Sequence, residues 1–411
     1  MNAVKTQRGI GLEHYQGIID DSLFDEVVGL ARRLKDVRVC HINATSYGGG
    51  VAEILQKEIP LAKGMGLQFD WKTVSAEPGF FDVTKKIHNG LQGADVKISE
   101  REWQIYQSCN IDQVKRINPS DYDVFFIHDP QPAEIIGCIG KNGAKWVWRC
   151  HIDTDEPNRA IADYFLKFLN LYDASIFTMK DYVLKGMKND IFIIEPAIDP
   201  LAIKNRCLSH KEAEELVRGF HIDTSRPLVT QVSRFDPWKD PIGVVDAYRA
   251  AKKEMPELQL AMIGSMADDD PEGQEIYNQL KEYAGENQDI HILTNHDALH
   301  DIEVNAFQTY SDVIIQKSVK EGFGLTVSEA LWKETPVIGG NVGGIPTQIQ
   351  DGKTGFLVNN SLECAEKIVY LVKNKKIGEK MGKLGKEDVR KKFLLPRLLR
   401  DELKLIEKLV H

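Results

Sequence analysis

The amino-acid sequence predicts an α/β protein built from two doubly wound domains, each a parallel sheet covered by helices. Short apolar runs alternate with longer amphipathic stretches, which is the pattern of parallel strands joined by crossover helices. The alternation pauses at the two prolines of segment 195–200 and then restarts. A chain of 411 residues is long enough for two or three domains. Two domains facing each other across a cleft are therefore expected.

The strands are expected where the apolar runs lie. In the first half these runs are Val37–Asn43, Val124–His128, Lys145–Cys150, Ala174–Thr178 and Ile191–Ile194. In the second half they are Leu228–Ser233, Leu258–Ile263, Ile290–Leu293, Val313–Gln316 and Thr335–Ile338. Helices are predicted from about Gly50, over Thr326–Lys333 and through the Lys-rich segment Ile377–Val410. The expected domains are 1–197 and 198–390, with a C-terminal helix over 391–411.

Composition excludes several classes of protein. Lys+Arg 52 against Asp+Glu 61 gives a net charge of −9, which argues against a broad surface for nucleic acid or an anionic membrane. The first residues lack the apolar core of a signal peptide, and no apolar run is long enough to span a membrane. A cytoplasmic protein is expected. The cysteines are few and scattered, and Cys40, Cys138 and Cys150 have apolar neighbours, so buried reduced thiols are expected.

Two segments of the first half carry candidate binding residues. Segment 45–53 follows a strand and holds three glycines before a helix, so its backbone can approach an anion closely. A tight turn without a ligand explains it equally simply. Segment 151–158 follows the strand ending at Cys150, where open α/β sheets bind ligands. Asp153 and Asp155 could hold a divalent metal, recognise sugar hydroxyls or cap the following helix.

Two segments of the second half could bind a diphosphate. Arg234 and Lys239 bring two cations to a loop after a strand, although pairing with Asp236 and Asp240 at the surface is the simpler alternative. In segment 321–329, the N–H groups of Phe323, Gly324, Leu325 and Thr326 would point at one spot at the start of a helix. Glu329, one turn further on, could accept hydrogen bonds from vicinal hydroxyls. A helix that simply carries acidic residues near its start is the alternative.

These motifs resemble those of a known enzyme family. Glu321–Glu329 has the E-x7-E pattern of the retaining, nucleotide-sugar-dependent glycosyltransferases of the GT-B fold (family four), and the similarity continues through Gly343–Pro346 and Asp351–Leu357. Tyr47–Glu53, Arg149–Asp153 and Ser233–Asp240 are similar to the branch that holds trehalose synthases and trehalose phosphorylases. The fungal phosphorylases are considerably longer, which favours the compact synthases. The resemblance implies a GT-B fold whose C-terminal helix crosses back to the first domain.

The resemblance also implies a role for each matching residue. Glu321 would hold hydroxyls of the donor glucose, helped by the N–H groups of Phe323 and Gly324. Leu325 and Thr326 would contact phosphate, Glu329 the ribose, and Thr294 and Asn295 would lie near the base. Arg234 and Lys239 would neutralise the leaving diphosphate. In the first domain, Gly49 and Gly50 would cover the donor phosphate, His151 would contact the donor sugar near its 6-hydroxyl, and Tyr47 and Asp153 would lie on the acceptor side.

The expected reaction is NDP-glucose plus glucose giving α,α-trehalose, reversible and with retention, with Arg234, Lys239, Glu321 and His151 as its catalytic residues. UDP- and ADP-glucose are both open as donors. No tightly bound cofactor and no metal site are indicated, and Mg²⁺ stimulation is left open. The expected partners are small molecules, with no nucleic acid or membrane, and a homodimer is allowed. Alternatives are a trehalose phosphorylase, a transferase forming sucrose or another glycoside, an NDP-sugar epimerase on the same fold and a non-catalytic sugar-nucleotide sensor.

Overall fold

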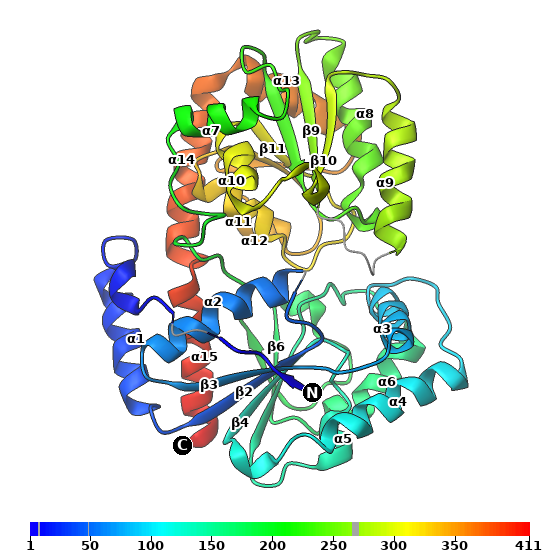
Figure 1. Cartoon of the computed structure of the whole chain (residues 1–411), viewed down its shortest axis with the longest axis vertical. Helices are drawn as coiled ribbons and strands as arrows, with labels where there is room; N and C mark the ends of the chain where they lie inside the picture. The colour runs from blue at the N-terminus through cyan, green and yellow to red at the C-terminus, as the bar shows by residue number, and fades with distance from the viewer. Residues whose placement is uncertain (7–8, 48, 265–270) are drawn as a thin grey trace. The chain divides into compact units, whose positions relative to one another are not determined.

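The computed structural model describes residues 1–6, 9–47, 49–264 and 271–411, and it divides the chain into two compact units (Figure 1). Unit 1 comprises Met1–Ala197 together with Leu395–His411, and unit 2 comprises Ile198–Leu394. The sequence expectations place the divisions before 198 and 391, and the structure divides the chain before 198 and 395. The later second division has a local cause: the backbone N–H of Ile198 donates to the carbonyl of Phe393, so 393–394 stay in unit 2.

Unit 1 is built on a seven-stranded sheet of order β1-β3-β2-β4-β5-β6-β7, in which β1 is antiparallel to β3 and all other pairs are parallel. Its strands are β1 (Asn2–Ala3), β2 (Arg38–Asn43), β3 (Gln68–Thr73), β4 (Val124–His128), β5 (Lys145–Arg149), β6 (Ala174–Phe177) and β7 (Asp190–Ile193). The chain leaves β2 for β3 on one side and returns to β4 on the other. The gap between the ends of β2 and β4 is therefore the topological switch point of this sheet, the usual ligand position in such folds.

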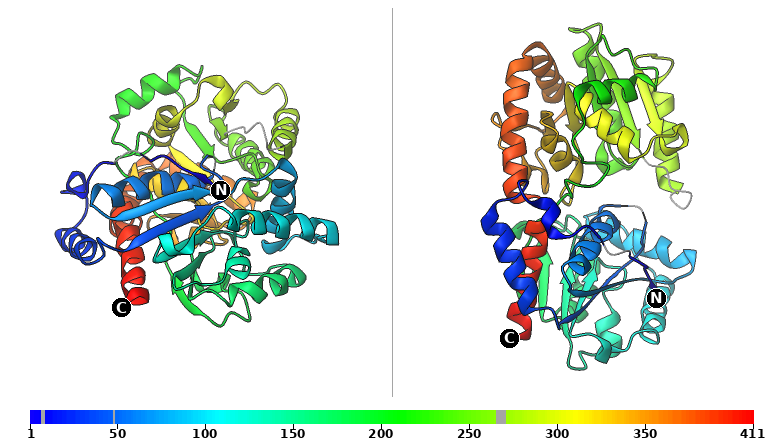
Figure 2. Two further views of the ribbon diagram at one scale, coloured as in Figure 1. Left: turned by 60° about the horizontal axis from the view of Figure 1, so that its bottom comes forward. Right: turned by 60° about the vertical axis from the view of Figure 1, so that its left-hand side comes forward.

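Helices cover both faces of the unit 1 sheet (Figure 2). On one face the aromatic-rich core packs under α3 (Pro78–Leu91), α4 (Glu100–Val114), α5 (Ile135–Ile139) and α6 (Arg159–Leu169). The other face is covered by α1 (Asp21–Arg33), α2 (Gly50–Gly64) and α15 (Leu395–Val410), and α15 packs against both α1 and α2. The C-terminal helix α15 thus belongs to unit 1, as the family resemblance implies.

Unit 2 is built on a six-stranded parallel sheet of order β10-β9-β8-β11-β12-β13. Its strands are β8 (Leu228–Val232), β9 (Gln259–Gly264), β10 (Ile290–Thr294), β11 (Val313–Gln316), β12 (Val337–Gly340) and β13 (Gly355–Val358). One face packs on α8 (Pro241–Lys252), α9 (Pro271–Ala284) and α13 (Ser361–Lys373), and the other on α7 (His210–Arg218) and α10 (Asp301–Tyr310). α11 (Leu325–Trp332), α12 (Ile345–Gln348) and α14 (Lys375–Lys392) complete the unit. The switch point lies between β8 and β11.

Some features differ from the sequence expectations. The strands β1, β3 and β13 are absent from the sequence prediction. The sequence of β3, Gln-Phe-Asp-Trp-Lys-Thr, has no continuous apolar run, because only its alternate residues are buried. The predicted helix 377–410 is two helices, α14 and α15, broken at Phe393 and Leu394 where the chain pairs with Ile198. Cys40 and Cys150 are buried as predicted, but the prediction for Cys138 was wrong, because the five-residue helix α5 turns it outward.

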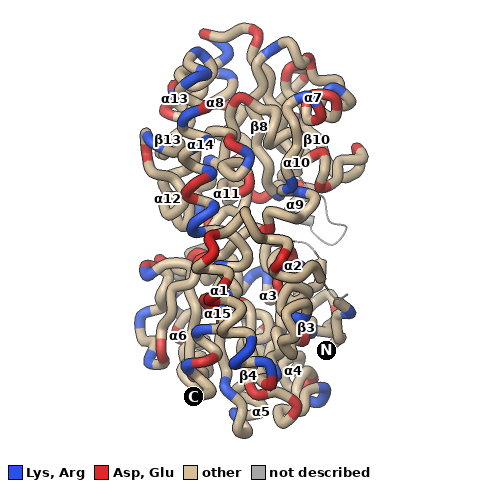
Figure 3. Tube along the Cα trace, turned by 90° about the vertical axis from the view of Figure 1, so that its left-hand side faces the viewer, with Lys and Arg blue, Asp and Glu red and all other residues tan. Residues whose placement is uncertain are grey.

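Charges of both signs are interspersed along the trace of both units (Figure 3). Among the described residues, no helix combines the length and the apolar character needed to cross a membrane.

Candidate active site

The switch point of unit 2 brings together two of the predicted cationic and acidic residues. Lys239 lies in the loop after β8, and Glu321 lies in the loop after β11, the neighbouring strand. The Nζ of Lys239 is 2.5 Å from Oε2 of Glu321. The same carboxylate oxygen accepts hydrogen bonds from the Gln316 amide (3.2 Å) and the Ser318 hydroxyl (3.1 Å). Because Glu321 is 7% exposed, these donors fix the direction of its carboxylate.

Arg234 stands beside this pair on the loop after β8. Its contact with Asp236 is long, with Nη2 3.3 Å from Oδ2, and the side chain of Arg234 is 47% exposed. Asp236 itself is held, because its Oδ1 accepts the Trp238 N–H. The pairing of Arg234 with Asp236 that the sequence allowed is therefore present. Within the described residues it uses one N–H of the guanidinium, which leaves further donors for an anion.

The start of α11 supplies a group of backbone donors. Gly324 precedes the helix with φ +83°, a conformation that favours glycine. Gly344 permits the turn to pack closely, because a Cβ there would lie 2.5 Å from the carbonyl oxygen of Gly322. Within the described residues, no hydrogen bond is made by the N–H groups of Phe323, Gly324, Leu325 and Thr326. These four donors lie at the positive end of the helix, next to Glu321.

Glu329 lies deeper in the unit than the ribose role suggests. Its exposed fraction is 0%, and its carboxylate pairs with the Nζ of Lys204 (2.7 Å) and accepts from the Gln308 amide (2.8 Å). Burial acts to raise the pKa of Glu329, but the charges of Lys204 and Lys333 outweigh it and lower the pKa. The residue is therefore an ionised, internally paired carboxylate, and its contact with ribose stays a prediction.

The two residues suggested near the base follow β10. The Thr294 hydroxyl is buried and donates to Asp297, while it accepts the His296 N–H in a capping box. Asn295 is exposed at the start of the same short turn. The side chain of Thr294 thus shapes the loop, and a base contact by either residue stays a prediction.

In unit 1, the glycine-rich segment leads from β2 into α2. Gly49 caps the helix with φ +81°, and Gly50 is its first residue. Before them, the Thr45 hydroxyl accepts the N–H of Tyr47 and donates to its carbonyl. This turn leaves the Tyr47 ring 82% exposed at the switch point, where it could stack on a sugar.

His151 and Asp153 follow β5 but have different surroundings. His151 is half-buried, and its backbone N–H donates to Oδ1 of Asp129 (2.8 Å). Asp153 is 1% exposed, and its Oδ1 accepts the Asp155 N–H. The segment's acidic residues therefore serve in part to cap a turn. Among the described residues, no group of three or more His, Cys, Asp or Glu is arranged to hold a metal.

Sequence reasoning missed Asp129, which follows β4 next to the switch point. It adopts φ +62°, an uncommon conformation for a residue other than glycine and one that clusters at functional sites. Burial raises the pKa of Asp129 to about 7, against the lowering effects of the His151 N–H and of Arg149. The signal was its position: a polar residue directly after an apolar strand.

Sequence reasoning also missed a buried polar network under β2, β4 and β5. His41, His128 and His151 form a hydrogen-bonded row. Next to it, Arg149 pairs with Glu402 of α15 in a fully buried contact. Burial first, and then the Glu402 carboxylate, raise the pKa of Glu58 on α2 well above its usual range, which favours its neutral form.

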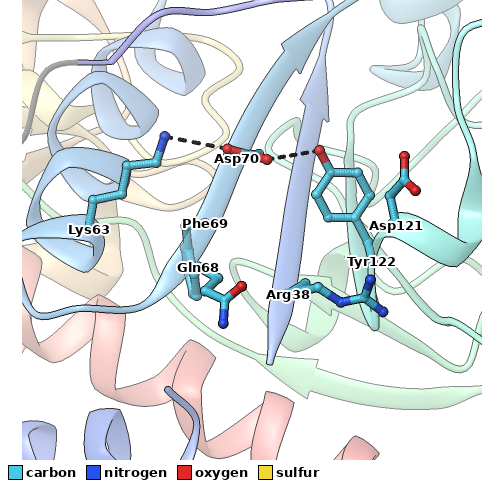
Figure 4. A pocket seen from close by; sticks show the side chains of 7 residues that line it. All are labelled: Arg38, Lys63, Gln68, Phe69, Asp70, Asp121 and Tyr122. Carbon is cyan, nitrogen blue, oxygen red and sulfur yellow. Dashed lines mark hydrogen bonds and ion pairs between the residues drawn. The ribbon is translucent and has the colours of Figure 1, made fainter. Parts of the chain in front are cut away.

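A hollow of about 350 Å³ lies elsewhere in unit 1, at the amino-terminal ends of β2 and β3 (Figure 4). None of the predicted site residues line it. Its two cations are already paired, Arg38 with Asp123 (2.8 Å) and Lys63 with Asp70 (3.4 Å). This hollow therefore does not explain the motifs, which lie at the opposite ends of the strands.

Comparisons with known proteins agree with the architecture and the motifs. The family model described as trehalose synthase, N-terminal domain, matches residues 41–184, and the model of the group 1 glycosyl transferases matches residues 212–388. The chain is 47% identical over 405 residues to a trehalose synthase from Rubrobacter xylanophilus, with 97% of each chain covered. It is 28% identical to a trehalose phosphorylase from Pleurotus pulmonarius, and this match covers 84% of the chain and 54% of the phosphorylase. A solved structure, a UDP-forming α,α-trehalose-phosphate synthase from Burkholderia xenovorans, superposes with a TM-score of 0.73 at 15% identity, covering 91% of this chain and all of that one.

Proposed function

Because the chain belongs to the trehalose synthase family of GT-B glycosyltransferases, we propose that it transfers glucose from an NDP-glucose to free glucose, giving α,α-trehalose. The observation that carries this proposal is the arrangement at the switch point of unit 2. There a fixed carboxylate, a partnered lysine, a solvent-facing arginine and a set of helix N–H donors lie on adjacent loops. This combination suits a sugar diphosphate, which presents hydroxyls at one end and anionic oxygens at the other.

Each group has a role that its surroundings support. Glu321 holds donor hydroxyls, because Lys239, Gln316 and Ser318 orient its carboxylate. Lys239 has three N–H donors, so it can keep its contact with Glu321 and still bind a phosphate oxygen. Arg234 and the N–H groups at the start of α11 bind the diphosphate, whose charge grows as the bond to the sugar breaks.

The proposed chemistry is a same-face substitution that retains the configuration at the donor carbon. The bond from C1 to the phosphate oxygen breaks, and a bond from C1 to the acceptor oxygen forms on the same face. The leaving phosphate takes the proton of the acceptor hydroxyl. Retaining glycosidases instead use two carboxylates about 5 Å apart. Among the described residues at the switch point of unit 2, Glu321 is the carboxylate candidate for the donor sugar, and the role proposed for it is to bind hydroxyls.

Product analysis tests the proposal. UDP-glucose or ADP-glucose incubated with glucose should give equal amounts of NDP and α,α-trehalose, identified by the coupling constants of both anomeric protons. Absence of trehalose with both donors would overturn it. Conversion of NDP-glucose to a different NDP-sugar in the absence of any acceptor would overturn it as well. The second outcome would identify an epimerase.

The nearest alternative is a trehalose phosphorylase, and the 28% identity to the Pleurotus enzyme is the observation that supports it. Running the reaction backwards separates the two. Trehalose with UDP or ADP should release NDP-glucose, whereas trehalose with inorganic phosphate should release no glucose 1-phosphate. The reverse pattern would assign phosphorolysis.

A further inference from the structure

Three histidines form a continuous row inside unit 1. His41 lies on β2, His128 ends β4, and His151 follows β5, so neighbouring strands carry them. The Nδ1 of His41 is 3.1 Å from Nε2 of His128, and the Nδ1 of His128 is 3.0 Å from Nε2 of His151. The rings also stack, with both pairs of centroids 5.3 Å apart. His41 and His128 are buried, and only His151 is partly exposed, so the row has one inner end and one outer end.

Burial favours the neutral form of all three rings in the folded protein. Burial and the nearby Arg149 guanidinium lower the pKa of His41 to about 3. They also hold the pKa values of His128 and His151 well below the usual range. Arg149 itself pairs with Glu402 of α15.

A row of three neutral imidazoles permits only two arrangements of protons. Each neutral ring carries one N–H, and each of the two gaps needs one proton for its hydrogen bond. The third proton must therefore lie at one end of the row. Either His41 carries it on Nε2, and His151 presents a bare Nδ1, or His151 carries it on Nδ1, and His41 has a bare Nε2.

The inner end decides between these arrangements. Nε2 of His41 is buried and has no hydrogen-bond partner among the described residues. Its ring stacks on Phe126 with the ring centroids 4.8 Å apart and lies 5.5 Å from Phe69, and the nearby charge that lowers its pKa is the Arg149 guanidinium. Buried backbone N–H groups are left without a partner less often than buried carbonyl groups, and the same preference favours a bare ring nitrogen over an unpaired ring N–H. The bare Nε2 on His41 is therefore favoured, which puts the third proton on Nδ1 of His151.

We propose that His41 and His128 are positioning residues that hold His151 with its proton on Nδ1, so that His151 donates a hydrogen bond to a sugar hydroxyl and does not act as a base. Nδ1 of His151 makes no hydrogen bond within the described residues, which leaves it for a ligand. The inference rests on the proposed function for the identity of the sugar, because the family resemblance suggests the 6-hydroxyl of the donor. The arrangement of protons does not depend on that function.

Nitrogen NMR tests the arrangement directly on the intact protein without substrate. In protein labelled with ¹⁵N-histidine, protonated and bare ring nitrogens give well-separated signals. The variants H41F, H128F and H151F assign the three rings by difference. The proposal expects Nδ1 of His151 to be protonated and its Nε2 to be bare. A protonated Nε2 on His151 would overturn it, and so would a pair of exchanging forms in equal amounts.

Kinetics test the positioning role. If His151 donates to the 6-hydroxyl, H128F should lower kcat/KM about tenfold with NDP-glucose and hardly at all with NDP-6-deoxyglucose, which lacks that hydroxyl. H128N should restore most of the preference for NDP-glucose, because the amide nitrogen of asparagine is one bond from Cγ, as Nδ1 of histidine is. A merely structural role predicts equal losses with both donors, and that result would overturn the proposal. Failure of the enzyme to make trehalose at all would refute the proposed function and leave the NMR result standing.

Discussion

His41 should make the protein less stable as the pH falls, and the size of this effect follows from its surroundings. The ring is fully buried, and its pKa is lowered to about 3, mainly by burial. In the unfolded chain the pKa returns to about 6.5. Because the folded-state pKa is the lower one, the stabilising contribution of the neutral ring is complete above about pH 6.5 and is lost as the pH falls below it. Between pH 7.5 and pH 5.0 the loss is about 2 kcal/mol for this one residue.

The substitution H41F removes this loss. A phenyl ring can keep the stacking on Phe126, whose plane is 10° from that of His41, and it cannot bind a proton. The free energy of unfolding should therefore fall less in H41F than in the wild type between pH 7.5 and pH 5.0, by about 2 kcal/mol. The other titrating groups nearby, such as Asp129 and Glu58, are present in both proteins, so their contributions cancel in the difference.

Urea unfolding followed by tryptophan fluorescence measures the effect, because Trp71, Trp103, Trp146 and Trp148 lie in unit 1. H14F is the matched control, because it makes the same substitution at an exposed histidine of the same unit. If the pH response of H41F equals that of the wild type, His41 is not held neutral by burial, and the proton count for the histidine row loses its basis.

Three further substitutions test the two units. R234A should lower turnover about a hundredfold, because it removes a group that stabilises the leaving diphosphate. The control R159A removes an arginine that is 94% exposed and should leave turnover unchanged. Normal turnover of R234A with a raised KM for glucose would refute the role of Arg234 at the diphosphate. E329Q should weaken NDP binding about tenfold in calorimetry, and unchanged affinity would restrict Glu329 to its internal pairing with Lys204. E402A should cost about 3–5 kcal/mol in urea unfolding by leaving Arg149 buried and unpaired, and a loss near zero would show that solvent reaches the pair.

The sequence predicts the strands that end at the two switch points better than the edges of the sheets. The runs at Val124–His128 and Val313–Gln316 are confirmed to the residue, because strands buried on both faces are continuously apolar. The strand β3 alternates exposed and buried residues and carries Asp70 and Lys72, so its sequence does not differ from that of a loop. The break between α14 and α15 depends on pairing with Ile198, which lies almost two hundred residues earlier.

In the candidate sites, too, contacts between loops of neighbouring strands can be predicted from the sequence, whereas contacts with distant parts of the chain cannot. The contact between Lys239 and Glu321 could be anticipated, because both residues follow strands that are neighbours in a doubly wound sheet. The contact between Arg149 and Glu402 could not, since it joins a strand of unit 1 to a helix at the end of the chain. Likewise, the burial of Glu329 depends on Lys204, which lies far from it in the sequence.

The buried polar face of unit 1 is difficult to explain by stability alone. The opposite face of the same sheet is packed with Phe, Trp, Ile and Cys side chains, so this scaffold can be filled with apolar residues. Under α2 and α15 the chain instead buries His41, His128, Arg149 and two carboxyl groups, and several of their polar atoms have no partner among the described residues. Groups of this kind cost free energy when they are not fully hydrogen-bonded, and apolar residues of similar volume are often as stable or more so. The network ends at His151, beside the switch point between β2 and β4. Orienting that one ring, and fixing which of its nitrogens carries the proton, is an effect that an apolar core could not supply.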